Sequence, residues 1–179
     1  MTTSGRRSVV LALVGLRCSG KTTVGRALAE RTGADFVDLD QVVASRTGLR
    51  SAGEVIEACG LERFRDLEEQ ALNDVLASAA RPLVLSTGGG VVVRAASRER
   101  LGQGATVAWL RAPLALLRQR MAADQGTSRP RITAGDEDEF ISLERERAPL
   151  LEALADEVVE VEGRDTRELA AHLDGLWRG

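Results

Sequence analysis

The fold is decided by the stretch VVLALVGLRCSGKT, residues 9–22. Its first six residues are all apolar, which is typical of a strand buried on both faces of a parallel sheet. The following eight, Gly15 to Thr22, match the pattern G-x-x-x-x-G-K-[ST] of a phosphate-binding loop. A helical pattern over residues 21–32 comes next, so strand, glycine-rich loop and helix occur in the order that this motif requires. The stretch therefore predicts a nucleotide-binding α/β fold.

The spacing of this phosphate loop (residues 15–22) has a chemical reason. Its glycines let backbone N–H groups curl around phosphates, and the following helix adds positive potential at its N-terminus. Lys21, the only lysine of the chain, is placed to reach the β- and γ-phosphates, and the Thr22 hydroxyl to bind Mg²⁺. A chance glycine-rich turn is the alternative, but motif and context agree. We therefore expect ATP and Mg²⁺ as cofactors, with Gly15, Ser19, Gly20, Lys21, Thr22 and Thr23 in contact with the nucleotide.

Strand and helix patterns alternate along the rest of the chain. We expect further strands at about 35–39, 82–87, 105–110 and 157–161, and further helices at about 41–47, 61–80, 95–101, 113–121, 136–154 and 167–177. Residues 123–135 are polar and lose periodicity, which predicts a long loop. This alternation predicts a single domain over residues 1–179, an α/β three-layer sandwich with a five-stranded parallel sheet.

Composition excludes several classes of protein. The net charge of −3 gives no reason to expect nucleic acid or an anionic membrane as a partner. Cys18 and Cys59 stand apart and His172 is the only histidine, which argues against a zinc site. Lone cysteines and the lack of an apolar run of about 18 residues favour the cytoplasm. We expect a monomer that acts on a small molecule.

The kind of nucleotide-dependent protein can be narrowed further. A switch GTPase would need a second lysine in its guanine-reading motif, and the chain has none. A machine ATPase would usually place a carboxylate after the third strand, where this chain has Ser86, Thr87 and Gly88. A small-molecule kinase remains.

Several polar features follow predicted strands or lie on predicted helices. Asp38 and Asp40 are expected on one side of the second strand's end, where α/β sites form. Arg65 and Glu68 are one helical turn apart and can pair, and the triplet Gly88 to Gly90 lets a ligand lie against bare backbone. Each has a plainer interpretation: a helix-capping turn at the aspartates, an exposed ion pair, or an ordinary glycine turn. Arg147, between charged neighbours, could likewise lie on a solvated helix face.

Taken in order, these motifs resemble the shikimate kinase family over nearly the whole chain. The matching elements are GLRCSGKTTVGRALA, DLDQVVASRTG, FRDLE, TGGG, SRP and RAPL. The resemblance implies a P-loop kinase fold like that of nucleoside monophosphate kinases, with a substrate-binding helical region at about 40–80 and a mobile lid at about 123–135. The reaction implied is transfer of the ATP γ-phosphoryl group to the 3-hydroxyl of shikimate.

The resemblance also implies roles for individual residues. On the nucleotide side, Lys21 would hold the phosphates, Thr22 the metal ion, Asp38 the metal's water shell, Arg120 the adenine and Arg129 the transferring phosphoryl group. On the acceptor side, Asp40 would bind the ring hydroxyls and accept the attacking proton. Arg65 and Arg147 would bind the carboxylate, Glu68 would hold Arg65, and Gly88, Gly89 and Gly90 would line the ring.

The chain departs from the family pattern at three residues, and its stretch between Arg120 and Arg129 is about two residues longer than usual. The family commonly has Glu where this chain has Leu61, Leu where it has Arg131, and Tyr where it has Leu151. These departures keep open an acceptor other than shikimate, such as aminoshikimate or a small polyol acid like gluconate. A nucleotide-binding protein without catalysis is a further alternative, which the intact candidate residues argue against.

Overall fold

A computed structural model describes residues 8–123 and 139–178 of the 179-residue chain. Five parallel strands form one sheet in the order β2-β3-β1-β4-β5, with Val10 beside Leu83 and Leu11 beside Thr106 in the register. The strands are β1 (Val10–Val14), β2 (Asp35–Asp38), β3 (Leu83–Ser86), β4 (Thr106–Arg111) and β5 (Glu157–Glu160). The five-stranded parallel sheet expected from the sequence is confirmed.

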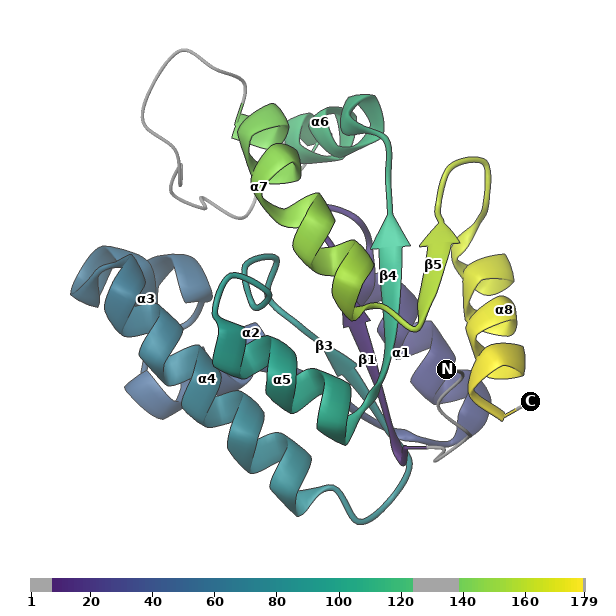
Figure 1. Cartoon of the computed structure of the whole chain (residues 1–179), viewed down its shortest axis with the longest axis horizontal. Coiled ribbons are helices and arrows are strands. Elements are labelled where there is room, and N and C mark those ends of the chain that lie inside the picture. The colour runs from purple at the N-terminus through teal and green to yellow at the C-terminus, as the bar shows by residue number, and fades with distance from the viewer. Residues whose placement is uncertain (1–7, 124–138, 179) are drawn as a thin grey trace.

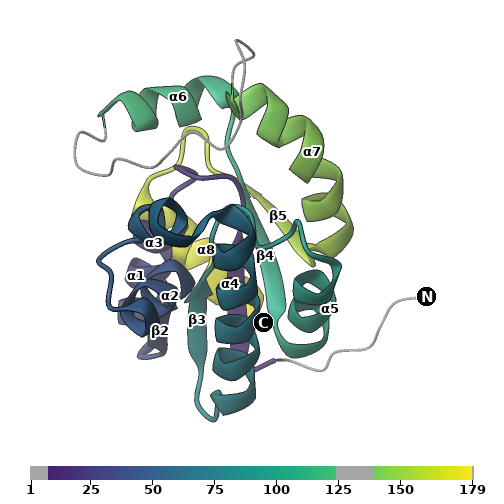
Figure 2. The ribbon, with the colours of Figure 1, turned by 90° about the vertical axis from the view of Figure 1, so that its left-hand side faces the viewer.

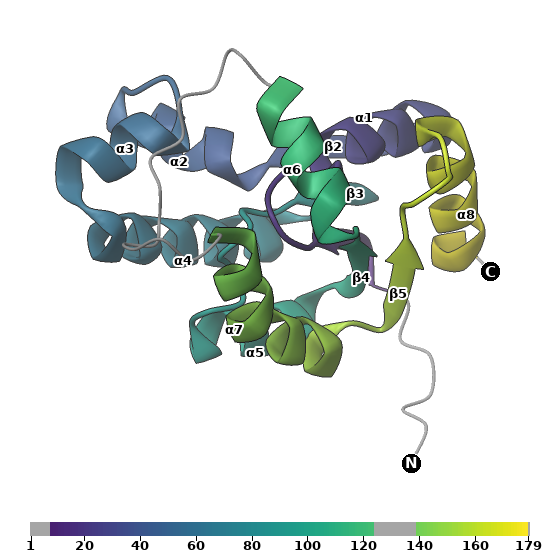
Figure 3. The ribbon, with the colours of Figure 1, turned by 90° about the horizontal axis from the view of Figure 1, so that it is seen from above.

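Helices cover both faces of this sheet (Figure 1). They are α1 (Lys21–Thr32), α2 (Leu39–Thr47), α3 (Ala52–Cys59), α4 (Leu61–Ser78), α5 (Ala95–Gly104), α6 (Leu114–Ala123), α7 (Glu139–Leu154) and α8 (Thr166–Arg178). Seen from above, α1 and α8 lie on one face, and α4, α5 and α7 lie on the other (Figure 3). The predicted three-layer sandwich is confirmed.

One helix, α3, has no counterpart among the predicted elements. The Ser51 hydroxyl accepts a hydrogen bond from the Glu54 backbone N–H at 3.2 Å and so caps its first turn. Serine followed three residues later by glutamate is a known signal for the start of a helix. The signal was present in the sequence, but the helix is only eight residues long and its apolar pattern is correspondingly brief.

Strand β1 explains the apolar run that opens the fold. Val10, Ala12 and Val14 pack into the core beneath α4 and α5, whereas Leu11 and Leu13 pack into the core beneath α1 and α8. Successive side chains of a strand point to opposite faces, so a central strand covered on both faces must be apolar throughout. Because all five strands are parallel, their carboxyl ends lie at one edge of the sheet.

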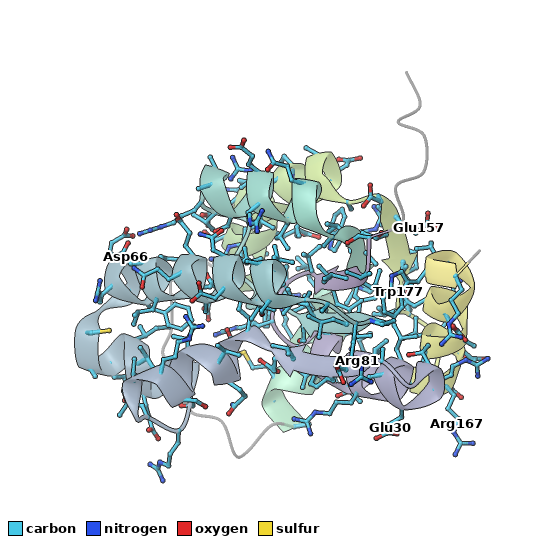
Figure 4. All side chains as sticks on the ribbon, turned by 90° about the horizontal axis from the view of Figure 1, so that it is seen from below. Glu30, Asp66, Arg81, Glu157, Arg167 and Trp177 are labelled. Atoms are coloured by element: carbon cyan, nitrogen blue, oxygen red, sulfur yellow. The ribbon has the colours of Figure 1, made fainter. Side chains whose placement is uncertain are left out.

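The two helices that bound the undescribed segment lie at this edge. α6 and the start of α7 lie above the carboxyl ends of β4 and β5 (Figures 1 and 2). In the view from below, charged side chains such as Glu30 and Arg167 extend outward from α1 and α8 (Figure 4). In the part of the chain that the structure describes, no helix is long and apolar enough to cross a membrane.

Candidate active site

Two adjoining cavities open at the carboxyl edge of the sheet. The larger, of about 600 Å³, is bounded by the phosphate loop, the end of α6 and the connection between β5 and α8. The smaller, of about 60 Å³, lies among α3, α4, α7 and the glycine triplet after β3. Arg17, Asp40 and Gly89 line both cavities. A group bound in one cavity can therefore meet a group bound in the other beside these three residues.

The phosphate loop forms the floor of the larger cavity. Gly15 has a φ of 142°, and a Cβ there would lie 2.6 Å from the Leu110 carbonyl oxygen, so the loop can leave β1 this closely only at a glycine. Lys21 is buried, and its Nζ donates hydrogen bonds to the carbonyls of Gly15 at 2.9 Å and Leu16 at 2.8 Å. These bonds hold the ammonium group against the loop at the start of α1, where the positive potential of the helix N-terminus also suits phosphate.

Two arginines from other elements line the larger cavity together with the loop. Arg120 of α6 donates from Nη1 to the carbonyls of Cys18 and Ser19, both at 3.1 Å. Arg164, in the connection between β5 and α8, lines the same cavity with Thr166. Arg120 was predicted, whereas Arg164 was missed. Its signal was its place just beyond the carboxyl end of a strand, where α/β sites form.

Three side-chain oxygens gather beside the start of α1. The Thr22 hydroxyl donates to Asp38 Oδ2 at 2.8 Å and lies 3.2 Å from the Ser86 hydroxyl. Oxygen ligands, with waters and phosphates completing the shell, are what Mg²⁺ prefers, so this donor set fits the expected metal. Among the described residues, no cluster of three or more His, Cys, Asp or Glu side chains offers an all-protein metal site.

Asp38 and Asp40 are both at the site, but the expected geometry of this pair is wrong. Asp38 is the last residue of β2 and caps α2, since its Oδ1 accepts from the Asp40 backbone N–H at 3.1 Å. Asp40 already belongs to the first turn of α2. The helical turn, rather than strand alternation, therefore separates the two carboxylates and directs only Asp40 to both cavities. Asp38 therefore both caps α2 and lines the larger cavity.

The charged wall of the smaller cavity is built on α4 and α7. Arg65 is 6% exposed and Glu68 is 2% exposed, and Arg65 Nη1 donates to Glu68 Oε2. Arg147 is 3% exposed and donates from Nη1 to the Gly89 carbonyl at 3.0 Å. The plainer interpretations, an exposed pair and a solvated helix face, are therefore wrong.

Burial also shifts the pKa values of Glu68 and Arg147 in this wall. It raises the pKa of Glu68 to about 7; the charge of Arg65 opposes this shift, and that of Asp40 adds to it. Burial likewise lowers the pKa of the Arg147 guanidinium, which stays charged because arginine titrates so high. Glu68 Oε1 is buried and has no hydrogen-bond partner among the described residues. The cavity therefore holds three buried guanidinium groups, with Arg17 as the third, beside Asp40 and a Glu68 carboxyl whose negative charge is only partly retained near neutral pH.

The glycine triplet leaves room for these side chains. A Cβ at Gly88 would lie 2.6 Å from Asp40 Oδ1 and would also collide with Glu68 Oε1. At Gly90, a Cβ would overlap the Arg65 guanidinium, 2.7 Å from Nη1. The triplet is therefore more than an ordinary turn, because the charged groups of the smaller cavity occupy the space that side chains would need.

The remaining wall of the smaller cavity is formed by Ala52, Gly53, Ile56 and Phe64. Leu61 and Leu151, the two departures from the family pattern that the structure describes, do not line it. Leu61 packs against the core and Leu151 lies within it, 1% exposed. Arg129, Arg131 and the predicted lid beyond Ala123 lie outside the described residues, so the role expected of Arg129 stays a prediction.

Comparisons with known proteins agree with this geometry. A family model described as shikimate kinase matches residues 17–174. A shikimate kinase of Nitratidesulfovibrio vulgaris is 42% identical over 149 residues, covering 82% of this chain and 83% of the relative, and one of Paracidovorax citrulli is 39% identical over 163 residues, covering 90% and 87%. The structure of Acinetobacter baumannii shikimate kinase in complex with shikimate matches with a TM-score of 0.84 at 34% identity, covering 93% of this chain and 91% of that one.

Proposed function

The chain belongs to the shikimate kinase family and phosphorylates shikimate with ATP, and we propose that its two adjoining cavities hold the two substrates. ATP occupies the larger cavity and shikimate the smaller. This assignment rests on one observation, that Asp40 lines both cavities. Asp40 therefore lies where an acceptor hydroxyl meets the phosphoryl group. The charges of the smaller cavity suit a small, rigid acid.

On the ATP side, the phosphate loop binds the β- and γ-phosphates with its N–H groups and with Lys21. Arg120 and Arg164, which line the same cavity, flank the nucleoside part. Thr22 would hold Mg²⁺, and the nearby Asp38 would orient the water bound to the metal. The metal, when bound, neutralises negative charge on the phosphate oxygens. The chain's own contribution is therefore to fix the donor phosphates in place.

On the acceptor side, Arg65 and Arg147 bind the shikimate carboxylate. A planar guanidinium offers two parallel donors to a carboxylate, and both groups are buried, so the interaction is little screened by water. Glu68 holds Arg65 in position. Gly88, Gly89 and Gly90 bring bare backbone against the ring. Shikimate is thereby oriented with its 3-hydroxyl toward Asp40.

Asp40 then acts as the general base. Its carboxylate accepts the proton of the 3-hydroxyl while the hydroxyl oxygen bonds to the γ-phosphorus and the bond from that phosphorus to the bridging oxygen of ADP breaks. The proton remains on Asp40 until it exchanges with solvent. Shikimate 3-phosphate and ADP are the products.

An ADP-release assay with ATP and Mg²⁺ tests this function, with shikimate, aminoshikimate, quinate and gluconate in parallel reactions. We expect turnover with shikimate at a KM between about 1 µM and 1 mM, the common range for enzymes. Turnover with an analogue and none with shikimate would refute the proposed acceptor. Because Leu61 and Leu151 do not line the smaller cavity, altered specificity would then be sought at Ala52, Gly53 and Ile56.

A further inference from the structure

Arg17 of the phosphate loop has no role in the reaction described so far. Its side chain is 6% exposed and forms an ion pair with Glu139, which is 8% exposed. The guanidinium also lies 3.2 Å from Met121 Sδ and 5.3 Å from the centre of the Phe140 ring. Met121 lies near the end of α6, and Glu139 and Phe140 begin α7. One arginine of the loop therefore contacts both α6, which lines the larger cavity, and α7, which lines the smaller one.

The backbone of Arg17 is connected to α7 by a second route. A Cβ at Gly89 would lie 3.0 Å from the Arg17 backbone nitrogen, so the two backbones are in close contact. The Gly89 carbonyl in turn accepts the hydrogen bond from Arg147. α7 is thus tied to the phosphate loop at its first turn through Glu139 and again at Arg147. The contacts form a closed ring, from Arg17 to Glu139, along α7 to Arg147, and through Gly89 back to Arg17. Arg17 and Gly89 line both cavities, so the ring passes between them.

The ion pair is poorly explained by stability alone. Two buried charges lose their hydration, and a pair of apolar side chains of similar volume is often at least as stable. Arg17 Nε is buried and has no hydrogen-bond partner among the described residues, which adds to the cost. An ion pair does, however, define distance and orientation more narrowly than apolar contacts do. Its placement points to a positional role.

We propose that the ion pair of Arg17 and Glu139 is a positioning clamp that holds α7, and with it Arg147, at a fixed place relative to the phosphate loop. The proposal rests on the assignment of ATP to the larger cavity and shikimate to the smaller. Arg17 is a positioning residue here, since it acts through α7. Because the clamp borders both cavities, it couples the two binding sites, so that nucleotide binding tightens shikimate binding, and the coupling is reciprocal.

The test compares Arg17→Met, Glu139→Gln and the double variant with the wild-type protein. Arg31→Met is the matched control, since it removes an arginine from an exposed ion pair with Asp174 far from the cavities. Two quantities are measured: the KM for shikimate in the ADP-release assay, and the ratio of the shikimate Kd without ADP to that with ADP, by calorimetry. Arg17→Lys, with circular dichroism of each variant, covers the case in which Arg17→Met does not fold.

We expect each single variant to raise the KM for shikimate by about tenfold or more, and the double variant to be no worse than the worse single one, because both remove the same interaction. The Kd ratio should exceed one in the wild type and in Arg31→Met and fall toward one in the clamp variants. Arg17→Lys should keep part of the ratio. Three results would each overturn the clamp. The first is an unchanged KM and Kd ratio in Glu139→Gln, and the second is a rise in KM in the double variant that equals the product of the two single rises. The third is a Kd ratio of one in the wild type. The Kd ratio is a binding measurement, so absence of shikimate turnover in the wild type would contradict the proposed function separately.

Discussion

Replacing Gly90 by alanine should damage shikimate binding while leaving ATP binding intact. Gly90 does not have a positive φ, so an alanine can adopt its backbone conformation. The added methyl group, however, would overlap the Arg65 guanidinium, 2.7 Å from Nη1 and nearer to Nη2. Arg65 is buried and paired with Glu68, so it has little space in which to move. The methyl group therefore displaces one of the two proposed carboxylate-binding arginines.

The size of the effect follows from the contact that is lost. A hydrogen bond to a charged group contributes about 1.5–3 kcal/mol. Since about 1.36 kcal/mol corresponds to a factor of ten, kcat/KM for shikimate should fall about 10- to 150-fold. Most of this loss should come from a higher KM for shikimate, with the KM for ATP unchanged. The ADP-release assay, with each substrate varied in turn, measures both constants.

Gly175→Ala is the matched control, because a Cβ at that position of α8 meets nothing within 4 Å. It should leave both KM values unchanged and stabilise the protein by about 0.5–1 kcal/mol, as alanine does in a helix interior. An unchanged KM for shikimate in Gly90→Ala would refute the placement of the shikimate carboxylate at Arg65. An equal rise in the KM for ATP would instead show a general distortion of the site.

Three further predictions follow from the site. Lys21→Ala should abolish turnover at saturating substrates, because the loop loses its only ammonium group; retained ADP release would contradict that role. Arg147→Ala should raise the KM for shikimate by about tenfold or more, and an unchanged KM would remove Arg147 from the carboxylate site. Burial raises the pKa of Glu68 from its ordinary 4.5 to about 7, so the folded protein holds a proton that the unfolded chain releases at lower pH. The contribution of Glu68 to the free energy of unfolding is thus fully present below about pH 4.5 and is lost as the pH rises through about 7. Urea unfolding should show a smaller loss of stability over this range in Glu68→Gln than in the wild type, and equal losses would contradict the shift.

Much of the fold could be predicted from strong local sequence patterns. The apolar run of β1 and the phosphate loop after it predicted a buried central strand and a nucleotide site, and both are present. The strands and the longer helices were found because their patterns repeat over enough residues. α3 was not predicted because eight residues contain too few apolar positions to show a helical period, although Ser51 and Glu54 form a recognisable capping signal.

The site was predicted as a set of residue types, while its geometry was not. The motifs pointed to Asp40, Arg65, Glu68, Arg147 and the glycine triplet, and the structure brings all of them to one cavity. Their burial could not be read locally, because it depends on α4 and α7 closing over the triplet from separate parts of the chain. Arg164 was missed although it follows a predicted strand, because only the structure shows that the connection after β5 lines the larger cavity.

Residue order was enough to predict the class of fold, the phosphate loop and the family, because these depend on residues that are neighbours along the chain or on their order. Tertiary structure alone decided that Arg17 pairs with Glu139, 122 residues away, and that Asp40 lines two cavities. It also decided that Glu68 is buried deeply enough to raise its pKa. Contacts and desolvation of this kind arise from packing between distant segments, and no local pattern encodes the distances involved.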